Sequence, residues 1–167
     1  MTERLSGGTL TGVTRRGERV YRTTGPWTPS VHDLLRHLER ERFDRCPRVL
    51  GLAEDGREIL SWVEGRSPGA RPWPDWVWRD DVLRATGRWL RRYHDAVRDY
   101  RSPADARWRM CWAPQQADEI ICHFDVAPRN IVLQADGEIA VIDWDVAAPG
   151  TVRAELAKAA NAFLDPS

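Results

Sequence analysis

Asp125, Asn130 and Asp143 have the residue types and the spacing for chemistry at a metal ion. Residues 131–133 and 138–142 read as two β-strands joined at Asp136-Gly137, a dipeptide that strongly favours a hairpin. If the turn has two or four residues, the residue numbers of any two cross-strand partners add up to 273. Asn130 and Asp143 would then lie opposite each other, with Cβ atoms about 4.5–5.5 Å apart. An amide oxygen and a carboxylate at that distance can share a hard cation such as Mg²⁺.

Asp125 lies in the polar loop that precedes Asn130. A carboxylate at this position can accept a proton from a substrate hydroxyl while the metal ion holds phosphate groups. Alternation along the hairpin predicts a buried apolar face beneath the polar pair, formed by Ile131, Leu133, Ala140 and Ile142. In the purely structural alternative, Asp125 and Asn130 cap the loop and Asp143 ends a strand.

Two segments around these residues resemble motifs of a known superfamily. Residues 123–130, His-Phe-Asp-Val-Ala-Pro-Arg-Asn, resemble the catalytic loop H-x-D-x-x-x-x-N of kinase-fold phosphotransferases. Residues 142–145, Ile-Asp-Trp-Asp, resemble the I-D-W-[DE] that small-molecule kinases of the aminoglycoside phosphotransferase and choline kinase type carry in place of D-F-G. The resemblance covers residues 121–149 specifically and most of the remaining chain coarsely.

This resemblance implies a role for each matching residue. Asp125 is the implied catalytic base or hydroxyl-orienting group, and Asn130 and Asp143 are the implied metal ligands. His123 shapes the loop, and Asp145 assists the metal ion or the substrate. The implied fold is α+β, protein-kinase-like and two-lobed, with a small N-terminal antiparallel sheet plus a helix, a mostly helical C-terminal lobe that holds the catalytic hairpin, and a shortened C-terminus.

A weaker resemblance lies upstream, where residues 89–96 are similar to the L-x-x-L-H helix that precedes the catalytic loop in this superfamily. His94 falls near the apolar face that contains Tyr93 and Val97. We therefore expect His94 to be a hydrogen-bonded histidine of the core or of an interface.

The resemblance also implies ATP or GTP and Mg²⁺ as cofactors. Gly7, Gly8 and Gly12 lie where a hairpin would cover the phosphates, and their backbone amides can approach a triphosphate closely, although an ordinary turn explains them equally well. The superfamily holds the phosphates with a lysine, but Lys158 is the only lysine here and lies far downstream. Arg22 occupies the matching position and can bind phosphate bidentately. Its acidic partner on the following helix is open, with Asp33 and Glu39 as candidates.

The surrounding elements must position these residues. The N-terminal part reads as a strand–turn–strand up to Arg22, an amphipathic helix over 31–42 with Ser30 as its N-cap, and a second hairpin over 48–63. Further helices are predicted over 80–99 and 152–163, whereas residues 101–117 give no clear element. We expect a nucleotide-binding lobe at 1–65, a hinge at 66–79 that is rich in Gly, Pro and Arg, and a catalytic lobe at 80–167.

The composition limits the partners. Lys+Arg and Asp+Glu are both 25, so the formal charge is zero and nothing favours a nucleic acid. The three cysteines form no C-x-x-C pair, which is typical of reduced, mostly buried thiols in a cytosolic protein. No apolar segment approaches the length of a membrane span. We expect a cytoplasmic protein whose partners are a nucleotide and a small hydroxylated substrate.

Several functions are compatible with these residues. The first is transfer of the nucleotide γ-phosphoryl group to a hydroxyl of a small molecule, either aminoglycoside-like or an amino alcohol. The second is a pseudokinase-like nucleotide-binding module in which Arg22 and a shortened substrate pocket leave binding without turnover. A Ser/Thr protein kinase is disfavoured because no A-P-E segment follows residue 145. A metal hydrolase using Asp125, Asp143 and Asp145 is the remaining alternative.

Overall fold

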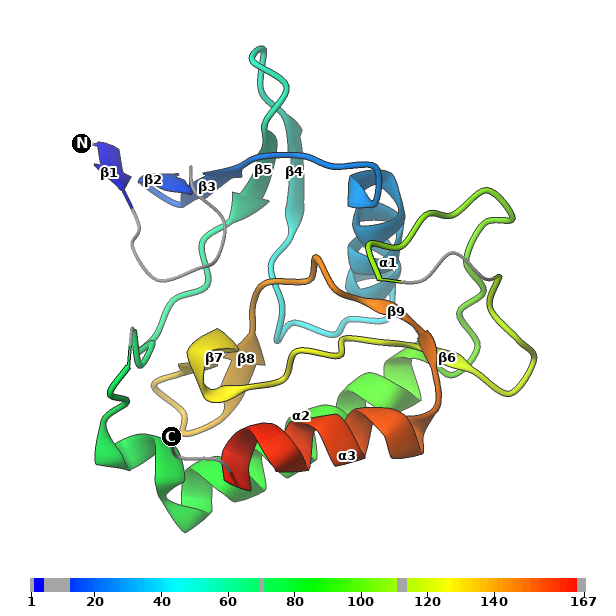
Figure 1. The fold of residues 1–167 in the computed structure, drawn as a ribbon. Coiled ribbons are helices and arrows are strands. Elements are labelled where there is room, and N and C mark those ends of the chain that lie inside the picture. Colours follow the sequence, from blue (N-terminus) through cyan, green and yellow to red (C-terminus); the bar gives the residue numbers. More distant parts are fainter. Residues whose placement is uncertain (1, 5–12, 70, 111–113, 165–167) are drawn as a thin grey trace.

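The computed structural model describes residues 2–4, 13–69, 71–110 and 114–164. The N-terminal part forms a five-stranded antiparallel sheet with strand order β1-β2-β3-β5-β4. Its strands are β1 (Thr2–Arg4), β2 (Thr14–Arg16), β3 (Arg19–Arg22), β4 (Val49–Leu52) and β5 (Glu58–Ser61). Helix α1 (Thr28–Arg40) lies beside this sheet in the upper half of Figure 1.

Helix α1 begins earlier than its apolar periodicity suggested. Pro29 occupies its first turn, where a missing N–H costs no intrahelical hydrogen bond. Ser30 is therefore inside the helix, and its hydroxyl accepts a hydrogen bond from the backbone N–H of Arg107 at 2.8 Å instead of capping the helix. The predicted apolar face is confirmed: Val31, Leu34, Leu35 and Leu38 are all buried.

The C-terminal part contains two longer helices and two small strand pairs. Helix α2 (Asp80–Val97) follows the short 3₁₀ turn η1 (Asp75–Trp78). Strand β6 (Ile120–Cys122) pairs with β9 (Ala148–Gly150), and β7 (Ile131–Leu133) pairs with β8 (Ile139–Val141) after the 3₁₀ turn η2 (Pro128–Asn130). Helix α3 (Val152–Leu164) completes an α+β fold, as predicted.

The connection between the two parts is tied to the hairpin. The backbone N–H of Arg66 donates to the Leu133 carbonyl at 2.8 Å, and the Leu133 N–H donates back to the Arg66 carbonyl at 3.0 Å. The division at residues 65 and 79 remains a prediction.

The β7–β8 hairpin corrects the predicted register. Ile131 pairs with Val141 and Leu133 with Ile139, so paired positions add up to 272 instead of 273. The physical reason is a three-residue loop: the Gln134 N–H donates to the Glu138 carbonyl at 2.9 Å, and Gly137 takes the left-handed conformation with φ 81°. Asn130 consequently lies opposite Ile142, whose N–H donates to the Asn130 carbonyl at 3.0 Å.

The register shift also changes the buried face of the hairpin. The members of this face that belong to the hydrophobic core are Ile131, Ile139 and Val141, with Leu133 packed against them. Ala140 and Ile142, which were predicted to share that face, belong to the opposite one because a shift of one residue exchanges the faces of a strand.

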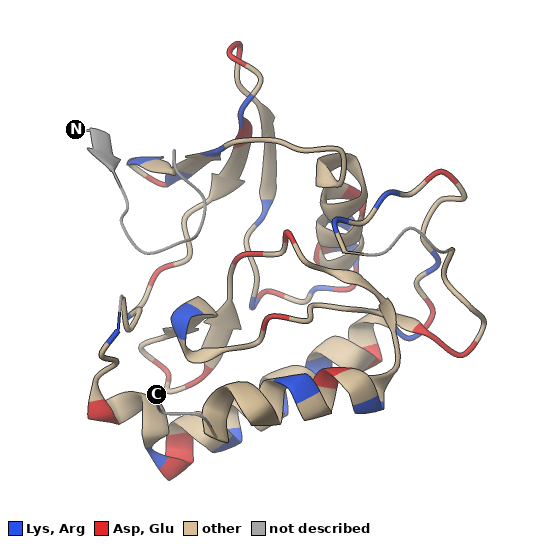
Figure 2. Cartoon of the chain, in the orientation of Figure 1, with Lys and Arg blue, Asp and Glu red and all other residues tan. Residues whose placement is uncertain are grey.

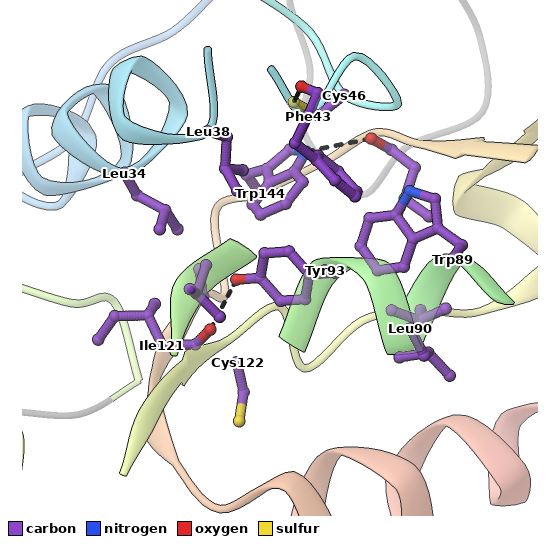
Figure 3. Packing of buried hydrophobic residues seen from close by; sticks show 14 of the residues in the cluster. Leu34, Leu38, Phe43, Cys46, Trp89, Leu90, Tyr93, Ile121, Cys122 and Trp144 are labelled. Carbon is purple, nitrogen blue, oxygen red and sulfur yellow. Dashed lines mark hydrogen bonds between the residues drawn. The ribbon is translucent and has the colours of Figure 1, made fainter. Parts of the chain in front are cut away.

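One hydrophobic core joins the two parts of the chain (Figure 3). Leu34 and Leu38 reach it from α1, and Trp89 and Tyr93 from α2. Two large aromatic residues of this core have paired polar atoms: the Tyr93 hydroxyl donates to the Ile121 carbonyl at 2.6 Å and the Trp144 indole to the Val141 carbonyl at 3.1 Å. The shared core fixes the sheet and the hairpin relative to each other.

Acidic and basic positions are interspersed along the described elements, in keeping with the balanced composition (Figure 2). Among the described helices there is none with the length and apolar character that a membrane span requires.

Candidate active site

A cavity of about 340 Å³ lies between the N-terminal sheet and the β7–β8 hairpin. Val20 and Leu60 line it from the sheet, and Val132 and Ile142 line it from the hairpin. Its polar lining includes Arg22, Asn130 and Asp143. The volume falls within the range of small-molecule sites, and apolar walls with a few polar groups are typical of them.

The loop before β7 brings Asp125 and Asn130 together. The amide nitrogen of Asn130 donates to Asp125 Oδ2 at 2.6 Å and to the Asp125 carbonyl at 2.9 Å. Arg129 donates to the other carboxylate oxygen of Asp125. The Asp125 side chain is thus oriented from two sides, as a proton acceptor must be.

Asp143 follows β8 and turns sharply, with a left-handed backbone at φ 64°. Such a conformation in a residue with a side chain costs about 1–3 kcal/mol and is found preferentially at functional sites. The Asp143 carboxylate is half-buried, lines the cavity, and accepts a hydrogen bond from Arg22 Nη2 at 3.0 Å. The structure therefore places both predicted metal ligands on one cavity, although they are not cross-strand partners.

Arg22 ends strand β3 and points its guanidinium at three carboxylates. Its Nη2 lies 2.9 Å from Asp145 Oδ1 as well as 3.0 Å from Asp143, and its Nη1 lies 3.6 Å from Glu58 Oε1. Burial opposes the charge of Arg22, but attraction by these carboxylates outweighs burial and holds the Arg22 pKa above its ordinary value.

Asp145 is more deeply buried than Asp143, with 5% of the residue exposed. Among the described residues, its Oδ2 atom has no hydrogen-bond partner, and Arg109 Nη1 lies 3.6 Å from it. Burial raises the pKa of Asp145 above its ordinary value, and the charges of Asp143 and Glu58 act in the same direction, against the attraction of Arg22. The site therefore carries more negative charge than Arg22 alone balances.

This charge excess and the available oxygen atoms fit a magnesium ion. The amide nitrogen of Asn130 is used by Asp125, which leaves its amide oxygen as a ligand, and Arg22 contacts only one oxygen of Asp143. In the part of the chain that the structure describes, no three His, Cys, Asp or Glu side chains form a metal-binding cluster. Mg²⁺ does not need one, because it is commonly held by one or two protein oxygens together with water and phosphate oxygens.

Sequence reasoning missed Glu155, which anchors the loop before Asp125 from helix α3. Its Oε1 accepts hydrogen bonds from the backbone N–H groups of His123 at 2.6 Å and Phe124 at 3.2 Å. Its Oε2 lies 2.7 Å from His94 Nε2 on α2, so the prediction of a hydrogen-bonded histidine at an interface is confirmed. Phe124 has φ 58°, a turn that this anchor holds in place. The local sequence offers no signal for this role, because the partners of Glu155 lie far from it along the chain.

His123 is fully buried, and burial lowers its pKa. Its Nδ1 accepts a hydrogen bond from the Asp125 N–H at 3.1 Å, and its ring packs edge-on against Trp144 with 4.5 Å between centroids. These contacts suit the predicted loop-shaping role.

The remaining candidates fall elsewhere. Gly7, Gly8 and Gly12 lie outside the described residues. Neither candidate for the acidic partner of Arg22 contacts it: Asp33 accepts a hydrogen bond from the Tyr100 hydroxyl at 2.7 Å, and Glu39 lies 3.9 Å from Arg48. Instead of these two residues, Glu58 on strand β5 supplies a carboxylate next to Arg22.

Known proteins show matching sequences and folds. Residues 77–167 match the sequence model of the family described as "Phosphotransferase enzyme family". The chain is 40% identical over 159 residues to the trifolitoxin immunity protein of Rhizobium leguminosarum bv. trifolii, an alignment that covers 93% of this chain and 59% of that protein. The chain thus spans about three fifths of the length of this relative.

Solved structures of similar fold include small-molecule kinases. The GDP complex of aminoglycoside 2'-phosphotransferase-IIIa has a TM-score of 0.61 at 12% identity, covering 97% of this chain and 72% of that chain. The gentamicin-APH(2")-IIa complex has a TM-score of 0.64 at 10% identity, covering 98% and 76%. A choline/ethanolamine kinase family protein from Mesorhizobium loti has a TM-score of 0.57 at 13% identity, covering 98% and 69%. The chain belongs to the phosphotransferase enzyme family and has the protein-kinase-like fold of the aminoglycoside and choline kinases.

Proposed function

We propose that this protein transfers the γ-phosphoryl group of ATP or GTP to a hydroxyl group of a small molecule, with Mg²⁺ as cofactor. The observation that supports this most strongly is that Asn130 and Asp143 line one cavity, while Asn130 also donates a hydrogen bond to Asp125. A cytoplasmic location, where nucleotide and Mg²⁺ are available, accompanies this proposal.

The residues divide the work of the reaction. Asp125, oriented by Asn130 and Arg129, accepts the proton of the attacking hydroxyl. Asn130 and Asp143 would hold Mg²⁺, which when bound neutralises charge on the nucleotide phosphates. Arg22 donates to phosphate oxygens from the sheet side of the cavity, and the apolar walls accommodate the base.

The comparisons support the choice of acceptors to test. The gentamicin complex and the choline/ethanolamine kinase family protein support an aminoglycoside-like or amino-alcohol acceptor. The similarity to the trifolitoxin immunity protein supports including a toxin as a third class of acceptor. The GDP complex supports testing GTP beside ATP.

A transfer assay with γ-labelled ATP and GTP tests this function. We expect label to move to at least one hydroxylated acceptor from a panel of aminoglycosides, amino alcohols and toxin, only when Mg²⁺ is present. Asp125→Asn should bind nucleotide like the wild type and transfer no label. Transfer that persists in Asp125→Asn would refute the assigned base.

The second candidate is a nucleotide-binding module without turnover. It is favoured by one observation: Arg22 stands where the superfamily has a lysine and is already engaged by Asp143 and Asp145. Tight Mg²⁺-dependent nucleotide binding, with no transfer to any member of the acceptor panel, would favour this candidate.

A further inference from the structure

Two buried polar residues, Glu58 and His32, form a series of contacts that reaches Arg22 through its Nη1 atom. Strands β3 and β5 pair Arg22 directly with Glu58 across the sheet. One oxygen of Glu58, Oε1, lies 3.6 Å from Arg22 Nη1, and the other, Oε2, lies 2.8 Å from His32 Nε2 on helix α1. Glu58 is 3% exposed and His32 is 5% exposed, so solvent does not compete for these contacts.

In this series of contacts, His32 orients Glu58 and Glu58 orients Arg22. A buried carboxylate is strongly unfavourable unless both of its oxygens are compensated. Because His32 binds Oε2, the remaining oxygen of Glu58 faces Arg22. The guanidinium of Arg22 is therefore held through Nη1 by Glu58 and through Nη2 by Asp143 and Asp145.

The contacts of Arg22 differ in whether a ligand in the cavity can reach them. Asp143 lines the cavity and is a proposed metal ligand, so Mg²⁺ would compete with Arg22 for its oxygens. Glu58 and His32 are buried and are not among the residues that line the cavity. We therefore expect their contacts with Arg22 to be retained when a nucleotide occupies the cavity.

We infer that Glu58 and His32 are positioning residues that hold the Arg22 guanidinium toward the nucleotide phosphates. The acidic partner of the phosphate-binding cation thus comes from strand β5, and helix α1 contributes a histidine that orients it. This inference rests on the proposed function, because it needs a nucleotide in the cavity.

Titration of a fluorescent ATP analogue in the presence of Mg²⁺ tests the inference. Glu58→Gln and His32→Leu should each weaken binding by about tenfold, because each removes one contact that orients Arg22. His32→Gln keeps a donor for Glu58 and should bind within about twofold of the wild type. Asp33→Asn is the matched control on the same helix, because its carboxylate contacts Tyr100, and it should leave affinity unchanged.

A double-mutant cycle separates positioning from a merely structural role. In an Arg22→Gln background, Glu58→Gln should cause no further loss, since Glu58 acts through Arg22. Additive losses in the double mutant would overturn the inference. Unchanged nucleotide affinity in His32→Leu would also overturn it. The His32→Leu measurement decides the question by itself if Glu58→Gln does not fold. Absence of saturable binding by the wild type would overturn the proposed function itself, together with this inference.

Discussion

Replacing Glu155 tests how the catalytic loop is held. The Glu155 side chain is 1% exposed and touches the backbone of residues 123 and 124 as well as His94. Glu155→Ala would leave one buried and one partly buried N–H group without an acceptor, and His94 without its partner. The loop that carries Asp125 would lose its attachment to α2 and α3.

The magnitude follows from these contacts. A hydrogen bond to a charged group contributes about 1.5–3 kcal/mol, and breaking a buried charged network costs about 3–5 kcal/mol. We therefore expect Glu155→Ala to lower the free energy of unfolding by about 3–5 kcal/mol. Glu155→Gln keeps the accepting oxygen, and its amide can donate to His94 in the other ring tautomer, so its cost should be about 1 kcal/mol.

Urea denaturation followed by circular dichroism measures both values. Arg153→Ala, an exposed substitution on the same helix, is the control and should stay within about 0.5 kcal/mol of the wild type. If Glu155→Ala were as stable as Arg153→Ala, the anchoring role of Glu155 would be refuted.

Three further outcomes are expected. Burial raises the pKa of Cys46 to about 12, so in a Cys111→Ser background the native Cys46 thiol should resist iodoacetamide at pH 8; rapid native-state labelling of Cys46 would contradict this. Burial lowers the pKa of His123 below 6.5, so the unfolded chain binds more protons and the free energy of unfolding should fall as pH drops through 6.5, by up to about 1.4 kcal/mol per pH unit. Urea titrations between pH 7.5 and 5.5 check this, and an unchanged slope in His123→Asn would refute the assignment. Gly65 has φ 140°, and an added Cβ would lie 2.5 Å from the Leu133 carbonyl oxygen, so Gly65→Ala should lower the melting temperature; an unchanged thermal melt would count against this contact.

The sequence allowed most elements to be predicted, because burial of an apolar face imposes its period on the chain locally. Val31, Leu34, Leu35 and Leu38 defined the buried face of α1 in this way. The register of the catalytic hairpin could not be predicted, because Asp136-Gly137 is compatible with loops of two, three or four residues. Only the structure shows that Gly137 forms the left-handed end of a three-residue loop.

In the candidate site, too, some residues could be predicted from the sequence and others could not. Asp125 and Asn130 lie in one short loop, so the sequence was sufficient to place them in the same site, and the structure adds the hydrogen bond between them. Glu58 and Glu155 could not be recognised, because their partners are distant: Glu58 meets Arg22 across the sheet, and Glu155 meets a loop 32 residues earlier. In sequence both resemble ordinary charged positions, and only tertiary packing buries them.

The coupling between Mg²⁺ and nucleotide binding tests the central claim most directly, because it requires no knowledge of the acceptor. Calorimetric titration of ATP and GTP should be done with and without Mg²⁺ for the wild type and for Asp143→Asn. We predict that Mg²⁺ tightens nucleotide binding by at least about tenfold in the wild type, and that Asp143→Asn loses most of this gain. Nucleotide binding that is absent from the wild type, or that is equally tight without Mg²⁺, would contradict a metal-dependent phosphotransferase site at Asn130 and Asp143.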